Sequence, residues 1–323
     1  MMASAPLPVR DGVAPSRVFL PSGPWATVFE FLVERFPYLT DDVLHERMMA
    51  GDIVDSEGTA QRPDTPYEPQ QWLWYYRQVP DEPPVPFVLG LLYQDEHILV
   101  VDKPHFLPSI PGGRHVQETA LVRLRAMLNM PWLSPIHRLD KDTAGVMLFC
   151  TNPASRGAYQ SLFQTQRVIK EYEAVAPWRE DLNLPCEYRS RLEPSAAHFV
   201  MQEVPGEPNS QTHIDIIERR GAWAHYRLRP LTGRKHQLRA HMNALGLPIR
   251  NDSYYPNMVE EGLADDWSRP LQLLARSIEF KDPITGHYRY FESQRRLSDW
   301  PPALCEQLHY EPVLTSGSAS EHG

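Results

Sequence analysis

The sequence predicts an α+β fold built on a mixed, largely antiparallel sheet. Stretches that alternate like strands and stretches with helical spacing follow one another, but no strand-helix-strand repeat is sustained. Two pairs of predicted strands are joined by short turns, at Arg220-Gly221 and over 282–286, which is typical of antiparallel hairpins. With 323 residues, of which 42% are hydrophobic, the chain can bury a core in one large domain or two smaller ones.

The N-terminal part predicts a small module followed by a linker. Apolar residues with helical spacing between Trp25 and Val54 predict helices and a closing strand. Residues 63–86 contain seven of the 32 prolines, which remove backbone donors and discourage regular structure. We therefore expect a disordered start over 1–20, a module over 21–62 and a Pro-rich linker over 63–86.

Beyond the linker, strand and helix signals alternate up to a short tail. Asn152 can cap a helix and Pro153 suits its first turn, while Thr232 can cap a helix for which Gly246 is the expected C′ residue. The tail over 313–323 is rich in Ser and Gly, and we expect it to be disordered. The expected elements are strands around a turn at 94–97, a helix over 117–128, a strand over 146–149, a helix over 152–166, a strand over 168–177, a hairpin of 212–219 with 222–231, a helix from 232 to before 246, and a hairpin of 271–280 with 287–293.

Cysteine use and hydropathy predict the location. Cys150, Cys186 and Cys305 lie far apart and are odd in number, which favours reduced structural thiols over a disulfide framework or a metal site. No run approaches the ~18 apolar residues that a membrane helix needs, and the first residues lack the apolar core of a signal peptide. We therefore expect a cytoplasmic protein with no membrane segment.

The net charge of −9 argues at first against a nucleic-acid partner, because an acidic surface repels phosphate. The charge is unevenly distributed, however. Residues 214–250 contain eight Lys and Arg against only Asp215 and Glu218, a local excess of +6. An acidic total can therefore hide a basic site.

A dense polar run, PIHRLDKDTAG over 135–145, enters the apolar strand predicted at 146–149. One interpretation is a capped loop whose Arg and Asp side chains satisfy one another, since structural ion pairs are common. The other is a functional loop, which needs partner residues elsewhere in the chain.

Candidate partners lie in the segment TGRKHQLRAH. A helix beginning here would combine exposed backbone N–H groups with Arg234 and Lys235, an arrangement suited to phosphate. His236 and Arg239 are three residues apart and share a helix face. His236 and His241 are five apart and lack the spacing of zinc-binding helices, so we expect no metal. A solvated basic helix end is an equally good interpretation of this segment alone.

Together these stretches resemble the RluA-type RNA pseudouridine synthases. The resemblance covers about Pro86 to Pro312, and Thr27 to Gly58 is similar to a degenerate S4-type RNA-binding module. It implies the pseudouridine synthase fold, with flanking helices and a central catalytic cleft, over 87–312 and an S4-like module over 21–62. The runs that carry it are LLYQDEHILVVDKP, HRLDKDTAG, IKEYEAVAP and TGRKHQLRAHMNALGLPIRNDSYY, in this order.

The resemblance implies that the protein isomerises a specific uridine of structured rRNA or tRNA to pseudouridine. The family's catalytic carboxylate falls on Asp140, its active-site tyrosine on Tyr172 and its paired cation on Arg239. The reaction breaks the N1–C1′ bond and rejoins the base through C5 without a redox step, so no cofactor is expected. An ionised carboxylate near C1′ can act as nucleophile or as base, and the sequence does not choose between the two. An adjacent guanidinium keeps such a carboxylate ionised.

The target uridine must leave its stack to reach Asp140. Arg138 can fill the vacated space or bind the flanking phosphate, and Leu273 or Leu274 can form an apolar floor beneath the uracil. The residues expected to contact RNA are Arg138, Lys141, Arg234, Lys235, His236, Leu273 and Leu274.

The chain departs from the family pattern at two places. The family's Asn-Lys-Pro-x-Gly-Leu stands here as residues 102–107, DKPHFL, which lose the flexible Gly and predict a bulkier loop. The usual Leu-His-Ala stands here as Leu273-Leu274-Ala275, so the His is absent. Since the trio of Asp, Tyr and Arg is intact, we still expect activity.

Two other functions are compatible with the residues. One is a non-catalytic RNA-binding protein that retains the fold. The other is a glycosidase with Asp140 as nucleophile, which needs a second carboxylate about 5 Å or more away, and only Asp142 presents itself in a motif. RNA is the expected partner, and we expect a monomer.

Overall fold

The computed structural model describes residues 5–77, 82–195, 200–257 and 265–300. The chain forms two compact units. The first comprises Met1–Lys141, Met147–Thr165 and Asp282–His287, and the second comprises Asp142–Val146, Gln166–Lys281 and Tyr288–Gly323.

A small module of two helices and a three-stranded sheet opens the first unit. The strand order is β1-β3-β2, and both helices begin at a threonine whose hydroxyl accepts a backbone N–H, Thr27 from Glu30 and Thr40 from Val43. The helices and closing strand expected between Trp25 and Val54 are therefore confirmed. The elements are β1 (Ser16–Phe19), α1 (Val28–Arg35), α2 (Asp41–Ala50), β2 (Ile53–Val54) and β3 (Trp72–Tyr75).

Two strands lie in segments that we expected to be irregular. β1 falls within residues 1–20 and β3 within the Pro-rich segment 63–86, and the two strands pair antiparallel. The expectation was wrong there because the prolines stop at Pro69 and resume at Pro80. The interval between them is free to pair, and it buries Leu73 in the core of the module.

The rest of the first unit holds the hairpin expected around residues 94–97. Leu91 pairs with Val101 and Gln94 with Leu99, and every residue of the second strand is buried. Strand β7 begins in the second unit and ends in the first, where its neighbours are β5 and β6. The elements are β4 (Gly90–Gln94), β5 (Ile98–Lys103), α3 (Ala120–Leu128), β6 (Ser134–Pro135), β7 (Ala144–Cys150) and α4 (Arg156–Gln164).

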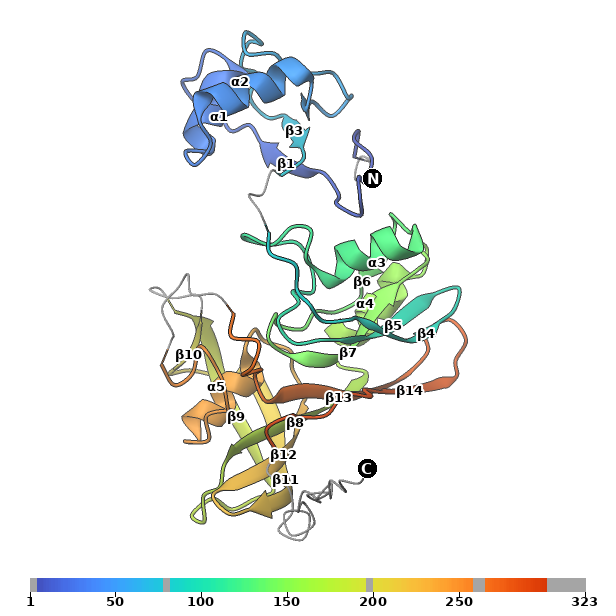
Figure 1. Ribbon diagram of the computed structural model, residues 1–323, viewed down its shortest axis with the longest axis vertical. Coiled ribbons are helices and arrows are strands. Elements are labelled where there is room, and N and C mark those ends of the chain that lie inside the picture. The colour runs from blue at the N-terminus through green and yellow to red at the C-terminus, as the bar shows by residue number, and fades with distance from the viewer. Residues whose placement is uncertain (1–4, 78–81, 196–199, 258–264, 301–323) are drawn as a thin grey trace, which may run out of the picture. The chain divides into compact units, whose positions relative to one another are not determined.

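The second unit is built on strands in the order β10-β9-β11-β12-β8-β13, most of them antiparallel, with the start of β7 parallel to β13 (Figure 1). Both expected hairpins, β11 with β12 and β13 with β14, are confirmed. Helix α5 packs on β9, β10 and β11. The elements are β8 (Val168–Pro177), β9 (Cys186–Pro194), β10 (Met201–Val204), β11 (Ser210–Arg220), β12 (Trp223–Pro230), α5 (Gln237–Ala244), β13 (Leu273–Lys281) and β14 (Tyr288–Glu292).

Helix α5 begins later than the sequence predicted. Thr232 is not its cap, because the Thr232 hydroxyl donates to the Gln237 side chain and accepts from the Gln211 amide. His236 occupies the cap position instead, with a left-handed backbone at φ 50°. Gly246, at φ 71°, follows the helix end as expected. Helix α4 likewise begins after Ser155 rather than at Asn152.

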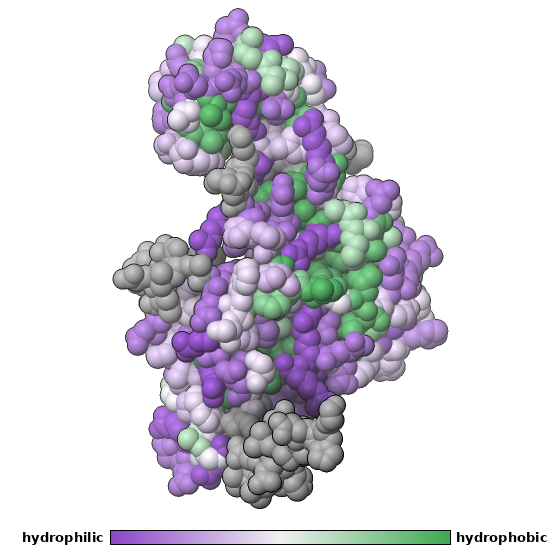
Figure 2. Space-filling model, in the orientation of Figure 1, coloured by the Kyte–Doolittle hydropathy of each residue, from purple (hydrophilic) through white to green (hydrophobic). Residues whose placement is uncertain are grey.

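Polar residues cover most of the face seen in Figure 2, which agrees with the apolar residues being collected in buried clusters. Cys150 and Cys186 are free thiols, whereas Cys305 and the tail over 313–323 lie outside the described residues. In the described part of the chain, every helix is too short or too polar to cross a bilayer.

Candidate active site

The loop that carries Asp140 lies in the first unit and is fixed at its start by β7. The Ile136 amide donates to the Leu148 carbonyl at 3.0 Å, and the Leu148 amide donates to Nε2 of His137 at 3.1 Å. The His137 ring also stacks on Phe163, with 4.6 Å between the ring centroids. These contacts therefore fix the backbone at Ile136 and His137, where the loop begins.

The backbone of the residues before and after Asp140 is held as well. The Ser109 hydroxyl donates to the Leu139 carbonyl at 2.5 Å and accepts from the Leu139 amide at 3.0 Å. The buried ammonium of Lys103 donates to the Lys141 carbonyl at 3.0 Å, and also to carbonyls within its own loop. Of the charged side chains predicted here, Arg138 is exposed, and Asp140 and Lys141 are partly buried.

The loop that departs from the family pattern keeps an unusual backbone. Phe106 stands at the position of the family's Gly and has φ 65°, a left-handed conformation that costs a side chain about 1–3 kcal/mol. Its ring is only 6% exposed and stacks on Phe87 at 5.9 Å. Burial of the ring offsets this backbone cost.

Arg239, in the second unit, is 1% exposed and is bound by an aspartate that the sequence analysis did not single out. Its Nε and Nη2 donate to the two carboxylate oxygens of Asp252 at 2.8 and 2.6 Å. Asp252 also accepts the backbone N–H groups of Tyr254 and Tyr255. The guanidinium lies 4.8 Å from the centroid of the Tyr254 ring. The NDSYY segment over 251–255 thus binds the arginine through the Asp252 carboxylate and the Tyr254 ring.

The third nitrogen of Arg239 lies near a second aspartate. Its Nη1 lies 3.9 Å from Oδ2 of Asp142, which is buried and follows Asp140 by two residues. The same cation therefore has a bidentate partner, Asp252, on one edge and Asp142 on another. Such a geometry uses the fork of a guanidinium and is not available to lysine.

His236 is an internal group rather than an exposed one. The ring is buried and stacks on Tyr254 at 5.3 Å. Burial, followed by the charges of Arg239 and Lys235, lowers the pKa of His236 to about 3. With its pKa lowered in this way, the ring is neutral near pH 7 and adds no positive charge to the basic segment.

Tyr172 lies in β8, between β12 and β13, and packs with the core cluster that contains Leu238 and Leu273. Leu274 belongs to a different cluster, with Ala144 and Val175. The two leucines point to opposite faces because neighbours along a strand alternate. Of the two, Leu273 is the one that shares a cluster with Tyr172.

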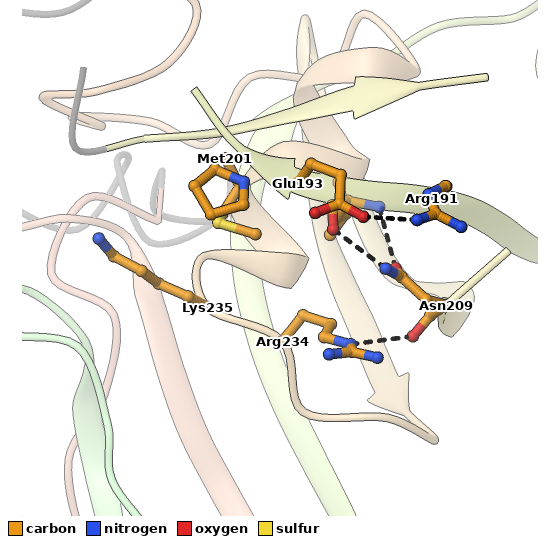
Figure 3. A pocket seen from close by; sticks show the side chains of 8 residues that line it. Arg191, Glu193, Met201, Asn209, Arg234 and Lys235 are labelled. Atoms are coloured by element: carbon orange, nitrogen blue, oxygen red, sulfur yellow. Dashed lines mark hydrogen bonds and ion pairs between the residues drawn. The ribbon is translucent and has the colours of Figure 1, made fainter. Parts of the chain in front are cut away.

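A hollow of about 540 Å³ beside the start of α5 contains two of the predicted RNA contacts, Arg234 and Lys235 (Figure 3). Arg234 Nε donates to the Asn209 carbonyl at 3.2 Å, and Arg191 pairs with Glu193 at 2.9 Å. Three cations and one carboxylate therefore line a concave surface, which suits an anionic group. The lining residues are Arg191, Leu192, Glu193, Pro194, Met201, Asn209, Arg234 and Lys235.

Within the described ranges, no group of three or more His, Cys, Asp or Glu side chains is arranged to hold a metal ion. The predicted residues fall into two sets. Arg138, Asp140 and Lys141 share one loop of the first unit, and the other predicted residues lie in the second unit.

Known proteins and a family model match the part of the chain that contains these motifs. The family model described as RNA pseudouridylate synthase matches residues 97–244, which include both HRLD and TGRKHQLR. The chain is 33% identical over 218 residues to the dual-specificity RNA pseudouridine synthase RluA of Salmonella typhi, covering 65% of this chain and 94% of that protein. It is 34% identical over 249 residues to the protein of the same name from Vibrio vulnificus, covering 68% and 95%.

The fold also matches a solved structure. The human protein called RNA pseudouridylate synthase domain containing 1 superposes with a TM-score of 0.53 at 24% identity, covering 67% of this chain and 86% of that one. This likeness confirms the predicted class of fold, an α+β architecture with a largely antiparallel sheet.

Proposed function

Because the chain belongs to the RluA-type family of RNA pseudouridine synthases, we propose that it converts a specific uridine of structured rRNA or tRNA to pseudouridine, with Asp140 as the catalytic carboxylate. The protein is an RNA-modifying isomerase, and we propose that it works as a monomer in the cytoplasm. The observation that carries the assignment of Asp140 is its loop. The carbonyls of Leu139 and Lys141, the residues before and after Asp140, accept hydrogen bonds from Ser109 and Lys103, and Asp142 lies beside Arg239.

In the proposed reaction the ionised Asp140 attacks C1′ or removes the C2′ proton, and the N1–C1′ bond breaks. The uracil turns, and C5 bonds to C1′ as the Asp140–C1′ bond breaks or, on the base route, as a proton returns to C2′. C5 then loses its proton and N1 gains one. In this proposal Tyr172 stacks on the base and accepts the C5 proton. Arg239 keeps the Asp140 carboxylate ionised, because a guanidinium stabilises the charged form. No redox step or external energy is involved, so the proposal includes no cofactor.

The proposed RNA contacts combine charge with one apolar surface. Arg138 and Lys141 flank the catalytic carboxylate, Leu273 lies under the uracil, and Arg234 and Lys235 bind a phosphate in the hollow. Arg191 adds a third cation to that hollow. His236 and Leu274 support the site from inside, since both are buried away from an incoming strand.

The double change Arg234→Gln with Lys235→Gln should weaken RNA binding and lessen its salt dependence. If each cation neutralises one phosphate, the slope of log affinity against log salt should fall by about 1.5 for an rRNA transcript that the enzyme modifies. The matched control is Arg219→Gln with Arg220→Gln, which removes equal charge from the other end of β11. Equal slopes for the two double variants would show that the hollow does not bind RNA.

Tritium release tests the proposed substrate class. RNA labelled with [5-³H]uridine is prepared from cells that lack the enzyme and separated into rRNA, tRNA and mRNA. Each conversion to pseudouridine displaces the C5 hydrogen, so we expect release from the rRNA or tRNA pool. Release confined to mRNA would contradict the substrate class, and binding without release from any pool would favour the non-catalytic alternative.

A further inference from the structure

We propose that Ser109 is a positioning residue, which sets the catalytic geometry of Asp140 by holding the peptide of Leu139. The inference rests on the proposed role of Asp140. Ser109 lies 30 residues from Leu139 in the sequence and is 4% exposed. Its hydroxyl meets both polar groups of Leu139, the carbonyl at 2.5 Å and the amide at 3.0 Å.

The Leu139 carbonyl belongs to the peptide that joins Leu139 to Asp140. A peptide is planar, so fixing its oxygen also fixes the nitrogen and the Cα of the next residue. The second bond, from the Leu139 amide, prevents the residue from rotating about the first. One side chain therefore fixes the position of the Asp140 Cα, from which the carboxylate projects.

Ser109 is itself tied to a rigid element. At the start of α3, the Ala120 amide donates to the Pro108 carbonyl at 2.8 Å and the Leu121 amide donates to the Ser109 carbonyl at 3.2 Å. These amides belong to the first turn of the helix, where no intrahelical acceptor exists. The helix is anchored in turn by its buried residues, among them Leu124. A continuous set of bonds thus runs from α3 through Ser109 to the Asp140 peptide.

The chemistry of a hydroxyl suits this position. A hydroxyl donates one hydrogen bond and accepts others, so it can serve a carbonyl and an amide at once. Alanine can do neither, whereas threonine can do both. A displacement of about 1 Å at a reacting group can cost a hundredfold in rate. We therefore expect the loss of this hydroxyl to affect catalysis more than RNA binding.

The test compares Ser109→Ala, Ser109→Thr and Thr119→Ala in the full chain. Ser109→Ala should lower the single-turnover rate of pseudouridine formation by about 10- to 100-fold, with RNA affinity within twofold of wild type. Ser109→Thr should restore most of the rate. Thr119→Ala is the stability control, since the Thr119 hydroxyl is buried and caps α3 through the Val122 amide. Its rate should stay near wild type when compared at equal folded fraction.

Two results would overturn the inference: a wild-type rate for Ser109→Ala, or an equal loss of rate for Thr119→Ala at equal folded fraction. If Ser109→Ala does not fold, the rate of Ser109→Thr decides, since threonine keeps both hydrogen bonds and should keep most of the rate. Asp140→Asn is included in the series. If Asp140→Asn remains active, the proposed function fails. If only Asp140→Asn is inactive, the positioning role of Ser109 fails and the proposed function stands.

Discussion

Asp140→Asn should lower the rate of pseudouridine formation by about 10⁴-fold or more, while RNA affinity and the urea midpoint stay close to wild type. Asparagine keeps the shape and the backbone contacts but lacks the charge that attacks C1′ or removes a proton. The loop should keep its course, because hydrogen bonds to the backbone of Leu139 and Lys141 hold it on both sides of the changed residue. Single-turnover formation of pseudouridine, filter binding and urea unfolding measure the three effects.

The matched control for this change is Asp142→Asn. Asp142 is a second aspartate of the same loop, is buried and lies 3.9 Å from Arg239. If Asp140 alone is the reacting group, Asp142→Asn should retain most of the rate and lose mainly stability. Appreciable product from Asp140→Asn, together with an inactive Asp142→Asn, would move the catalytic role to Asp142.

The strands were predictable because their signals are local. The alternation over 168–177 predicted β8 with its observed bounds, and short polar turns predicted the hairpins of β11 with β12 and β13 with β14. The start of α5 was not predictable in this way. Thr232 has the side chain of a cap, but its hydroxyl is engaged by Gln237 and by the distant Gln211. Such competition depends on tertiary contacts that a local pattern does not contain.

The charge exposed at the candidate site also depends on tertiary contacts that the sequence does not reveal. The sequence gathers a net +6 over 214–250, but carboxylates from outside that stretch pair with several of its arginines. Glu171 binds both Arg227 and Arg229, and Asp299 binds Arg250. The positive surface is therefore smaller than the count suggests, and the hollow at Arg234 and Lys235 is a concave part of it.

The carboxylate that binds Arg239 could not be predicted from the sequence either. The family resemblance directed attention to Asp140 as the partner. The bidentate contact is made by Asp252, 13 residues along the chain, whose position depends on how the segment after α5 folds back. The pairing of Arg239 with Asp140 stays a prediction, and the stability of this region depends first on Asp252.

Arg239→Ala should lower the free energy of unfolding by about 3–5 kcal/mol, because it leaves the buried Asp252 carboxylate without its bidentate partner. Both side chains of this pair are at most 1% exposed, so water cannot replace the guanidinium. The rate of pseudouridine formation should fall as well. Urea unfolding at neutral pH measures the loss of stability.

Arg189→Ala provides the control, since it removes an arginine whose pair with Glu187 is more than half exposed. Exposed pairs contribute about 0.2–1 kcal/mol, so the two arginines should differ by several-fold in effect. The double change Arg239→Ala with Asp252→Ala should cost less than the sum of the single changes, because it also removes the stranded charge. Equal losses for Arg189→Ala and Arg239→Ala would mean that solvent reaches Asp252. The fork that serves Asp252 on one edge and Asp142 on another would then not be the element that keeps the site in place.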